Sequence, residues 1–216
     1  MIVSENITTY VHSLEKPAGY FLEHLRQKAE GSGVPIIRRE MESFIKVLLA
    51  IHRPATILEI GTAVGYSAIF MGLNSGARIT TIENYEPRII EARKNLHMAE
   101  KEYPDLTGRI QMIAGNAEEV LKELVVPVDF IFLDAAKGQY ITMLPDILRL
   151  LPSGGVLLSD NILQDGALVR SRYATPRRQR TIHERMREYV WEVKHNEQLE
   201  TTLITIGDGV TLSIKK

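Results

Sequence analysis

The stretch that decides the fold is Thr-Ile-Leu-Glu-Ile-Gly-Thr-Ala-Val-Gly-Tyr-Ser, residues 56–67. Its apolar run at 57–60 ends at a glycine, and a helical pattern begins near Tyr66. This order is typical of a strand, a tight glycine turn and a helix N-terminus, which in open α/β sheets presents backbone N–H groups to a nucleotide-like ligand. The sequence therefore predicts a ligand site at this turn.

The same alternation of strand and helix continues downstream. We expect strands at 56–60, 78–83, 109–114, 128–133 and 155–159, and helices at 65–74, 86–102, 116–124 and 138–151. Near-continuous apolar strands with intervening helices predict a parallel sheet that is covered on both faces.

The C-terminal part has a different pattern. A long helix is expected at about 178–195, and two β-rich runs, 200–206 and 210–215, then flank Gly207-Asp208-Gly209 as in a hairpin. The expected fold class is therefore α/β, a Rossmann-like doubly wound sheet of seven strands, mostly parallel with a C-terminal antiparallel strand.

The N-terminal part is helical in pattern. Residues 5–31 carry two helical patterns broken near Pro17, and a third runs from about Arg38 to His52. We expect residues 1–53 to form a helical cover for an α/β domain at 54–216, within a single compact domain overall.

Composition excludes several classes of protein and of site. The chain has 216 residues, 44% of them hydrophobic and 25% charged, a net charge of −1 and no cysteine. Disulfides and thiolate metal sites are excluded, so any metal must be held by oxygen or nitrogen ligands. The first residues lack the pattern of a signal peptide, and no apolar run approaches the roughly 20 residues that span a bilayer. We therefore expect a cytoplasmic protein with no membrane partner.

The glycine turn departs from the dinucleotide fingerprint G-x-G-x-x-G. Ala63 and Tyr66 stand where its second and third glycines belong, and the second glycine normally admits a pyrophosphate. Glu83 ends the next strand, where a carboxylate can accept both hydroxyls of a ribose. The pattern favours an adenosine ligand without a pyrophosphate, which suggests S-adenosylmethionine. The alternative is a tight turn that binds no ligand.

Three ordered segments carry a family resemblance: 58–67, Phe-Leu-Asp-Ala-Ala-Lys-Gly-Gln-Tyr at 132–140 and Ser-Asp-Asn at 159–161. With them the chain resembles the metal-dependent class I S-adenosylmethionine O-methyltransferases related to the catechol and caffeoyl-CoA enzymes. The resemblance implies a set of cofactor-binding residues: Glu59, Gly61, Thr62 and Ser67 at the methionine end, Glu83 at the ribose, Asn116 and Ala117 beside the adenine, and Asp134. Many relatives have Asp where this chain has Asn116, which weakens that one contact.

Polar residues follow two neighbouring strands of the predicted sheet. Asp134 ends the fourth strand, and Asp160 and Asn161 end the fifth, so all three should meet at the carboxyl edge of the sheet. Two carboxylates and an amide oxygen suit Mg²⁺, or Mn²⁺, with positions left for water and substrate. The alternative is that these side chains only cap the helices that follow.

The family resemblance also implies a reaction. The metal would chelate two neighbouring oxygens of the substrate and lower the pKa of the oxygen to be methylated. The catalytic residues would be Lys137 and Asp134, with Lys137 taking the proton or holding the oxyanion. The alternative for Lys137 is a surface lysine at a helix start, where its positive charge is slightly unfavourable.

An arginine-rich stretch, 170–187, follows the Ser-Asp-Asn motif and contains seven arginines and one acidic residue. Arginine favours bidentate contacts with phosphate, which suggests an RNA substrate held by Arg170, Arg172, Arg177, Arg178 and Arg180. The alternative is a solvated helix face.

This stretch, together with 134–140 and the closing Ile-Gly-Asp-Gly, resembles the bacterial tRNA 5-hydroxyuridine methyltransferases. That resemblance implies methylation of 5-hydroxyuridine to 5-methoxyuridine at the wobble position, with the tRNA anticodon loop as partner. The alternatives are a small-molecule catechol or phenolic O-methyltransferase and a non-catalytic nucleotide-binding module. We also expect a homodimer, with the apolar N-terminal helices as its interface.

Overall fold

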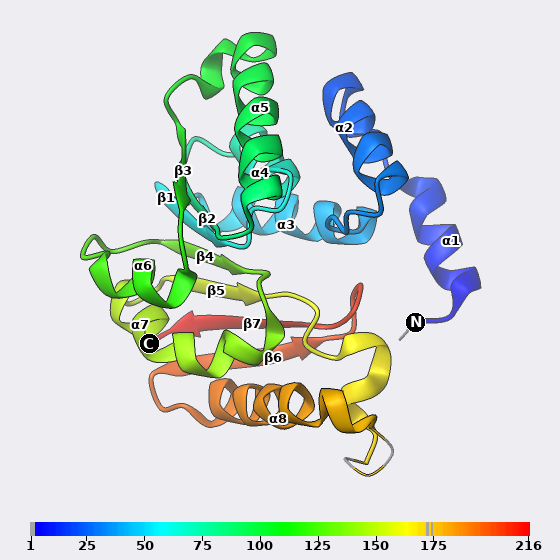
Figure 1. The fold of residues 1–216 in the computed structure, drawn as a ribbon, viewed down its shortest axis with the longest axis vertical. Coiled ribbons are helices and arrows are strands. Elements are labelled where there is room, and N and C mark those ends of the chain that lie inside the picture. Colours follow the sequence, from blue (N-terminus) through cyan, green and yellow to red (C-terminus); the bar gives the residue numbers. More distant parts are fainter. Residues whose placement is uncertain (1–2, 172, 174) are drawn as a thin grey trace. The chain divides into compact units, whose positions relative to one another are not determined.

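The computed structural model describes residues 3–171, 173 and 175–216 (Figure 1). The chain forms two compact units. The N-terminal unit is Thr9–Ala117, and the C-terminal unit is Glu118–Lys216 together with the first residues up to Thr8. The sequence-based division at residue 53 stays a prediction. Within the described residues, no helix is both long enough and apolar enough to cross a bilayer.

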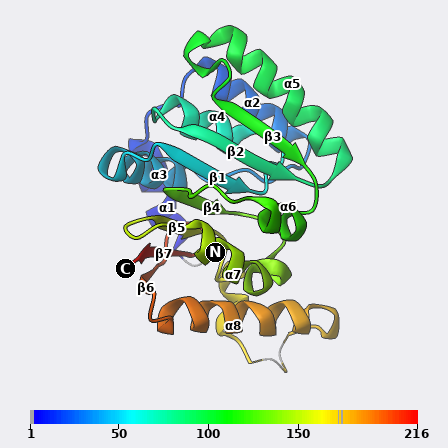
Figure 2. The same ribbon diagram turned by 90° about the vertical axis from the view of Figure 1, so that its left-hand side faces the viewer.

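The N-terminal unit contains three parallel strands with β2 in the middle. Its elements are α1 (Glu5–Leu14), whose first residues belong to the other unit, α2 (Tyr20–Gly31), α3 (Arg39–His52), β1 (Thr56–Ile60), α4 (Tyr66–Leu73), β2 (Arg78–Glu83), α5 (Glu86–Glu102), the 3-10 turn η1 (Pro104–Leu106) and β3 (Ile110–Ala114). The helices α4 and α5 contact each other and both pack on β2 and β3 (Figure 2). Small buried residues on α5, Ala92 and Ala99, permit this close approach.

The C-terminal unit contains four strands in the order β4-β5-β7-β6. Its elements are α6 (Ala117–Glu123), β4 (Phe130–Leu133), the 3-10 turn η2 (Lys137–Gln139), α7 (Tyr140–Leu150), β5 (Val156–Ser159), η3 (Gln164–Val169), η5 (Arg177–Gln179), α8 (Arg180–His195), β6 (Leu199–Ile204) and β7 (Val210–Lys215). Strand β7 runs antiparallel to β5 and β6, whereas β4 and β5 are parallel. Helix α8 packs on β6 and α7 (Figure 1).

The expected fold class is confirmed. The two units supply seven strands in the described part of the chain, and β7 runs antiparallel to both of its neighbours, β5 and β6. Each side chain of β4 and β5 is buried, as expected for strands covered on both faces.

Two helices begin later than the sequence pattern predicts. The helix expected from 138 is preceded by η2, and the helix expected from 178 is preceded by η5. Both helices therefore start with a tight 3-10 turn, which is common at helix N-termini. The first of these turns carries Lys137.

Candidate active site

The turn after β1 is built on backbone conformations that favour glycine. Gly61, Ala63 and Gly65 have φ angles of 104°, 47° and 83°. The amides of Gly61 and Thr62 donate to the Ile82 carbonyl at 3.0 and 3.2 Å, and the Gly65 amide donates to the Thr62 carbonyl at 2.8 Å. These amides are therefore used inside the protein, unlike the amides of a loop that cradles phosphates.

The carboxylate of Glu83 fixes this turn from the end of β2. Its Oε2 accepts a hydrogen bond from the Ala63 amide at 2.8 Å, and its Oε1 accepts from the amides of Asn84 and Tyr85, each at 3.0 Å. The side chain is half-buried, and a carboxylate has about four lone-pair sites. Glu83 therefore keeps acceptor capacity for a ligand beside the glycine turn.

Two of the residues expected at the methionine end are buried and linked through Thr81. The Thr81 hydroxyl donates to Glu59 Oε2 at 2.5 Å, and the hydroxyls of Thr62 and Thr81 lie 2.6 Å apart. Glu59 and Thr62 are almost completely inaccessible to solvent. Their side chains therefore support the turn from beneath.

Three more residues expected at the cofactor lie at helix starts. Ser67 is half-buried in the first turn of α4. Asn116 and Ala117 are half-buried where α6 begins. Each of the three is therefore accessible at the N-terminal end of a helix.

A buried polar group behind the turn was not found from the sequence. Arg26 of α2 donates to the carboxylate of Glu42 of α3 and, at 2.9 Å, to the Ile37 carbonyl. The hydroxyl of Tyr66, the first residue of α4, also donates to Glu42. Burial, followed by the hydrogen bond with Glu42, raises the pKa of Tyr66 far above its ordinary value. Two N-terminal helices thus hold the helix start that follows the glycine turn.

Asn95 of α5 supports the same turn. Its Nδ2 donates to the Val64 carbonyl at 2.9 Å, and its side chain is fully buried. A polar residue within the buried face of a predicted amphipathic helix is the sequence signal that would identify Asn95, and the same signal applies to Arg26 and Glu42.

In the C-terminal unit, the structure brings Asp134, Lys137, Asp160 and Asn161 together. The Lys137 ammonium lies 2.8 Å from Asp134 Oδ1 and 3.0 Å from Asn161 Oδ1. It also lies 2.9 Å from the Tyr140 hydroxyl and 3.5 Å from the Asp160 carbonyl oxygen. The positively charged Lys137 side chain therefore lies among the oxygens that the sequence predicts to bind a metal.

Asp160 is the most buried member of this cluster, with 3% of its surface exposed. Burial, and then the nearby charge of Asp134, raise the pKa of Asp160 to about 7. Its Oδ1 accepts a hydrogen bond from the Asn161 amide at 2.6 Å. The cluster therefore has an excess of buried negative charge that a cation would relieve.

The donor set fits a hard cation but is small. In the part of the chain that the structure describes, no group of three or more His, Cys, Asp or Glu side chains is placed to hold a metal. The set consists of two carboxylates and one amide oxygen, which leaves positions for water and substrate on Mg²⁺ or Mn²⁺.

Tyr140 is part of the cluster, although the sequence pattern predicted no role for it. It is fully buried, and its hydroxyl lies 3.0 Å from the Leu133 carbonyl and 3.2 Å from the Asp160 carbonyl. Burial, and then the charges of Asp134 and Asp160, raise the pKa of Tyr140 well above its ordinary value. Tyr140 therefore stays protonated and ties the ends of β4 and β5 together beside Lys137. Its position three residues after Lys137 was the available signal.

The hairpin turn before β7 holds the loop that carries Asn161. The amides of Ile162 and Leu163 donate to the carbonyls of Gly209 and Asp208 at 2.9 and 3.0 Å. A Cβ at position 209 would lie 2.5 Å from Leu163, so only glycine permits this approach. Asn161 itself has a φ of 54°, which asparagine tolerates better than most residues.

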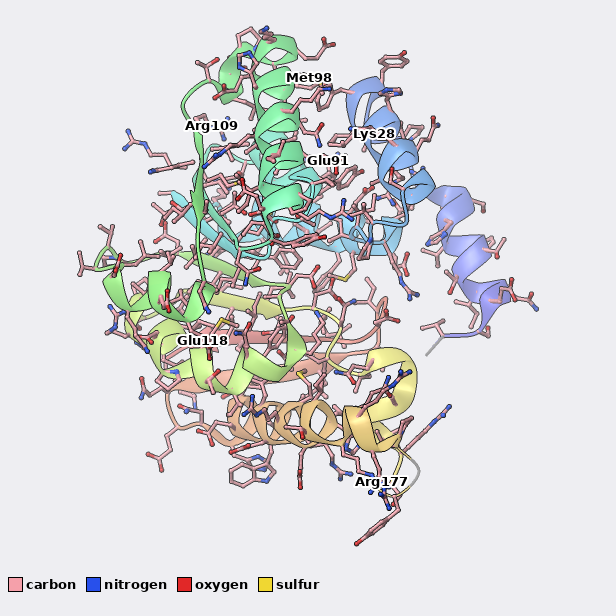
Figure 3. The ribbon with its side chains drawn as sticks, viewed as in Figure 1. Lys28, Glu91, Met98, Arg109, Glu118 and Arg177 are labelled. Atoms are coloured by element: carbon pink, nitrogen blue, oxygen red, sulfur yellow. The ribbon has the colours of Figure 1, made fainter. Side chains whose placement is uncertain are left out.

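The arginines predicted to bind RNA do not form one uniform set. Arg170, Arg177 and Arg178 are exposed, and Figure 3 labels Arg177 before the start of α8. Arg180 is half-buried and its Nε donates to the Thr175 carbonyl at 3.1 Å. Arg172 lies outside the described residues. Three of the five arginines predicted to bind RNA are therefore accessible to a polyanion.

Comparison with known proteins supports the resemblance read from the sequence. A catechol O-methyltransferase of Niastella koreensis is 35% identical over 133 residues, which are 58% of each chain. The solved structure of a candidate caffeoyl-CoA O-methyltransferase from Staphylococcus aureus is 30% identical, with a TM-score of 0.88 over 98% of this chain and 100% of that one. The O-methyltransferase of Bacillus cereus, solved in complex with SAH, is 25% identical, with a TM-score of 0.83 over 98% and 97% of the chains.

The match to a protein family covers nearly the whole chain. The family model described as O-methyltransferase matches residues 12–216. The relatives are of the catechol and caffeoyl-CoA type. The chain therefore belongs to the O-methyltransferase family, a class I family of S-adenosylmethionine-dependent enzymes.

Proposed function

We propose that this chain transfers a methyl group from S-adenosylmethionine to one of two neighbouring oxygens of its substrate, with the help of a divalent cation. The observation that carries the proposal is the cluster at the ends of β4 and β5. There the Lys137 ammonium lies within 3.0 Å of the Asp134 and Asn161 oxygens, beside a buried Asp160 whose pKa is raised to about 7.

The cation would be held by Asp134, Asp160 and Asn161. When bound, it supplies positive charge that lowers the pKa of an acceptor hydroxyl. Lys137 would then leave the oxygens it shares with the cation. The Tyr140 hydroxyl, 2.9 Å from the ammonium, would keep Lys137 close enough to take the acceptor's proton or hold its oxyanion.

The methyl donor would bind at the glycine turn. The Bacillus cereus relative contains SAH, the demethylated donor. The amides of Gly61, Thr62 and Gly65 are used internally, which suits a ligand that has no pyrophosphate. Glu83 would accept the ribose hydroxyls, Asn116 and Ala117 would flank the adenine, and Glu59, Gly61, Thr62 and Ser67 would surround the methionine end.

For the acceptor we propose 5-hydroxyuridine at the tRNA wobble position. Its O4 and O5 are adjacent and can chelate a cation as the two oxygens of a catechol do. Arg170, Arg177 and Arg178 are exposed and could contact phosphates of the anticodon loop. The second candidate is a small catechol or phenol, which the similarity to the catechol O-methyltransferase of Niastella koreensis favours.

Methyl transfer to both acceptors distinguishes these candidates. Wild-type protein and the Arg177→Ala/Arg178→Ala variant are assayed with tRNA that contains 5-hydroxyuridine and with catechol. We expect kcat/KM for tRNA to exceed that for catechol and to fall about 10-fold or more in the variant, with a weaker salt dependence and unchanged catechol turnover. Efficient methylation of catechol with inert tRNA would establish the small-molecule reading instead.

The nucleosides of the cell give a second test of the acceptor. Mass spectrometry of tRNA from cells that lack this gene should show loss of 5-methoxyuridine and accumulation of 5-hydroxyuridine. Unchanged 5-methoxyuridine would contradict the proposed substrate.

We also propose that the chain forms a homodimer through its N-terminal helices. The apolar residues Ile7, Tyr10 and Leu14 of α1 are 56%, 66% and 65% exposed and recur at helical spacing. Light scattering coupled to gel filtration would report the mass, and Tyr10→Glu should shift a dimer toward monomer.

A further inference from the structure

The turn that carries Lys137 is held from two sides by side chains of α6 and α8. We infer that Glu118 and Arg185 are positioning residues, which place Lys137 for the reaction by clamping the turn η2. This inference rests on the proposed role of Lys137 in methyl transfer.

Glu118, in the first turn of α6, holds one side of η2. Its Oε2 accepts a hydrogen bond from Gln139 Nε2 at 3.0 Å, and its Oε1 accepts from the Thr142 hydroxyl at 2.5 Å. The Thr142 hydroxyl also lies 2.8 Å from the Gln139 carbonyl oxygen. Figure 3 labels Glu118 in this part of the C-terminal unit. One carboxylate thus fixes both the last residue of η2 and the first turn of α7.

Arg185, in α8, holds the other side. Its Nη1 donates to the Gly138 carbonyl at 3.1 Å. Helix α8 packs along η2, and a Cβ at Gly138 would lie 3.7 Å from Ile182 of the same helix. The middle residue of η2 is therefore held by a hydrogen bond and lies close against α8.

The turn needs these contacts because it is short. It has three residues, and the Gln139 amide closes it on the Ala136 carbonyl at 2.9 Å. Hydrogen bonds in 3-10 turns have poorer geometry than those in α-helices. Lys137 must nevertheless keep its Nζ within about 3 Å of the Tyr140 hydroxyl, beside the acceptor, and a misplacement of about 1 Å can lower a rate roughly 100-fold.

One arginine of the arginine-rich stretch 170–187 contacts η2, so not all seven are available to bind phosphate. Arg185 is one of its seven arginines, but its guanidinium is used on η2. Arg187 lies two residues further along the same helix and is exposed, and its side chain makes no hydrogen bond or ion pair with the described residues. The two residues therefore form a matched pair with equal charge and different contacts.

Steady-state kinetics on this pair test the inference. We expect Arg185→Ala to lower kcat about 10- to 100-fold with KM for the methyl donor changed less than 2-fold, and Arg187→Ala to keep kcat within 2-fold of the wild type. Arg185→Lys, which keeps a donor, should recover part of the loss. Glu118→Gln should lower kcat in the same way, and thermal unfolding establishes that each variant is folded.

A double variant separates a role through Lys137 from a general structural role. If Arg185 acts through Lys137, adding Arg185→Ala to Lys137→Met should lower kcat no further. If the fold losses in kcat of the two single variants multiply in the double variant, Arg185 does not act through Lys137. That result, or equal kcat for the Arg185 and Arg187 variants, would overturn the inference while leaving the proposed function intact. Wild-type kcat in Lys137→Met would overturn both.

Discussion

The glycine turn of the N-terminal unit and the acidic cluster of the C-terminal unit are built in opposite ways. In the turn, backbone amides and the Glu83 carboxylate satisfy one another, and buried residues from α2, α3 and α5 support it. In the cluster, two carboxylates lie close together and Asp160 has a raised pKa. The turn is complete without a ligand, whereas the cluster is short of positive charge.

The difference separates two tasks of one enzyme. A site whose hydrogen bonds are already made can present a fixed shape to a cofactor without reorganisation. A site with unbalanced negative charge favours a cation, which in the proposed function would select the acceptor. Substitutions in the turn should therefore affect cofactor affinity or stability, and substitutions in the cluster should affect turnover.

The largest effect is expected for Asp160→Ala. It removes the most buried oxygen ligand, so kcat should fall at least about 1,000-fold while the Kd for S-adenosylmethionine stays within about 3-fold. Calorimetry measures the Kd. The matched variant Asp160→Asn keeps an oxygen to accept from the Asn161 amide and should also be inactive, which assigns the loss to the charge. Substantial turnover in either variant would contradict the expectation that the cluster, unlike the glycine turn, determines turnover.

Lys137→Met should have the next largest effect. Loss of the amine removes the group that takes the proton when neutral or holds the oxyanion when charged, so kcat should fall about 100- to 1,000-fold. The same change frees the oxygens of Asp134 and Asn161, so Mn²⁺ should bind at least as tightly as to the wild type. Weaker Mn²⁺ binding, measured by electron paramagnetic resonance, would show that Lys137 helps to assemble the cation site.

Glu42→Gln tests the support behind the glycine turn. It leaves the buried Arg26 guanidinium without its buried counter-charge, so the free energy of unfolding should fall by about 3 kcal/mol. The control is Glu30→Gln, which removes the other carboxylate on Arg26, at 3.3 Å and 59% exposed, and should cost less than about 0.5 kcal/mol. Denaturant titration measures both variants. Equal losses of unfolding free energy in the two variants would mean that the buried ion pair of Arg26 and Glu42 does not contribute more than the exposed one.

Glu83→Gln should act on cofactor affinity. It turns one accepting oxygen into an NH2 group, which cannot accept from the backbone amides of the turn, so at least one hydrogen bond is lost and S-adenosylmethionine should bind about 10-fold more weakly. Turnover at saturating cofactor should change less than 3-fold. A large loss of kcat with unchanged affinity would contradict the assignment of Glu83 to the cofactor.

The smallest effect concerns acid stability at the ion pair between α2 and α3. Hydrogen bonds from Arg39 lower the pKa of Glu23 to about 2. A lowered pKa stabilises the folded state above about pH 4.5, and that stabilisation is lost as pH falls toward 2. Glu23→Gln should therefore lower the free energy of unfolding by roughly 0.5–1 kcal/mol at neutral pH and by progressively less below pH 4.5. A difference that stays constant with pH would contradict this.

Local sequence patterns predicted most of the fold. The runs at 56–60, 78–83 and 86–102 correspond residue for residue to β1, β2 and α5, because apolar spacing and the adjoining turns mark their ends clearly. Helix starts were less predictable. Residues 137–139 and 177–179 form 3-10 turns that a local hydrogen bond closes, from Gln139 to Ala136 and from Gln179 to Pro176, and apolar spacing does not distinguish such a turn from the first turn of an α-helix.

The cluster was predictable as a set of residues but not as a network. Strand-end positions indicated Asp134, Asp160 and Asn161, since the carboxyl ends of neighbouring parallel strands meet. The roles of Tyr140, Glu118 and Arg185 depend on contacts between segments distant in sequence, up to 47 residues apart. No local pattern encodes such contacts.

In the proposed function, methyl transfer requires a cation held by the cluster at the ends of β4 and β5. The most direct measurement is turnover by protein stripped with EDTA and then titrated with Mg²⁺, with Mn²⁺ binding measured in parallel. We predict no turnover after stripping, full recovery on titration, one bound Mn²⁺ per chain, and neither recovery nor binding in Asp160→Ala. Undiminished turnover in EDTA by the wild type would contradict the account.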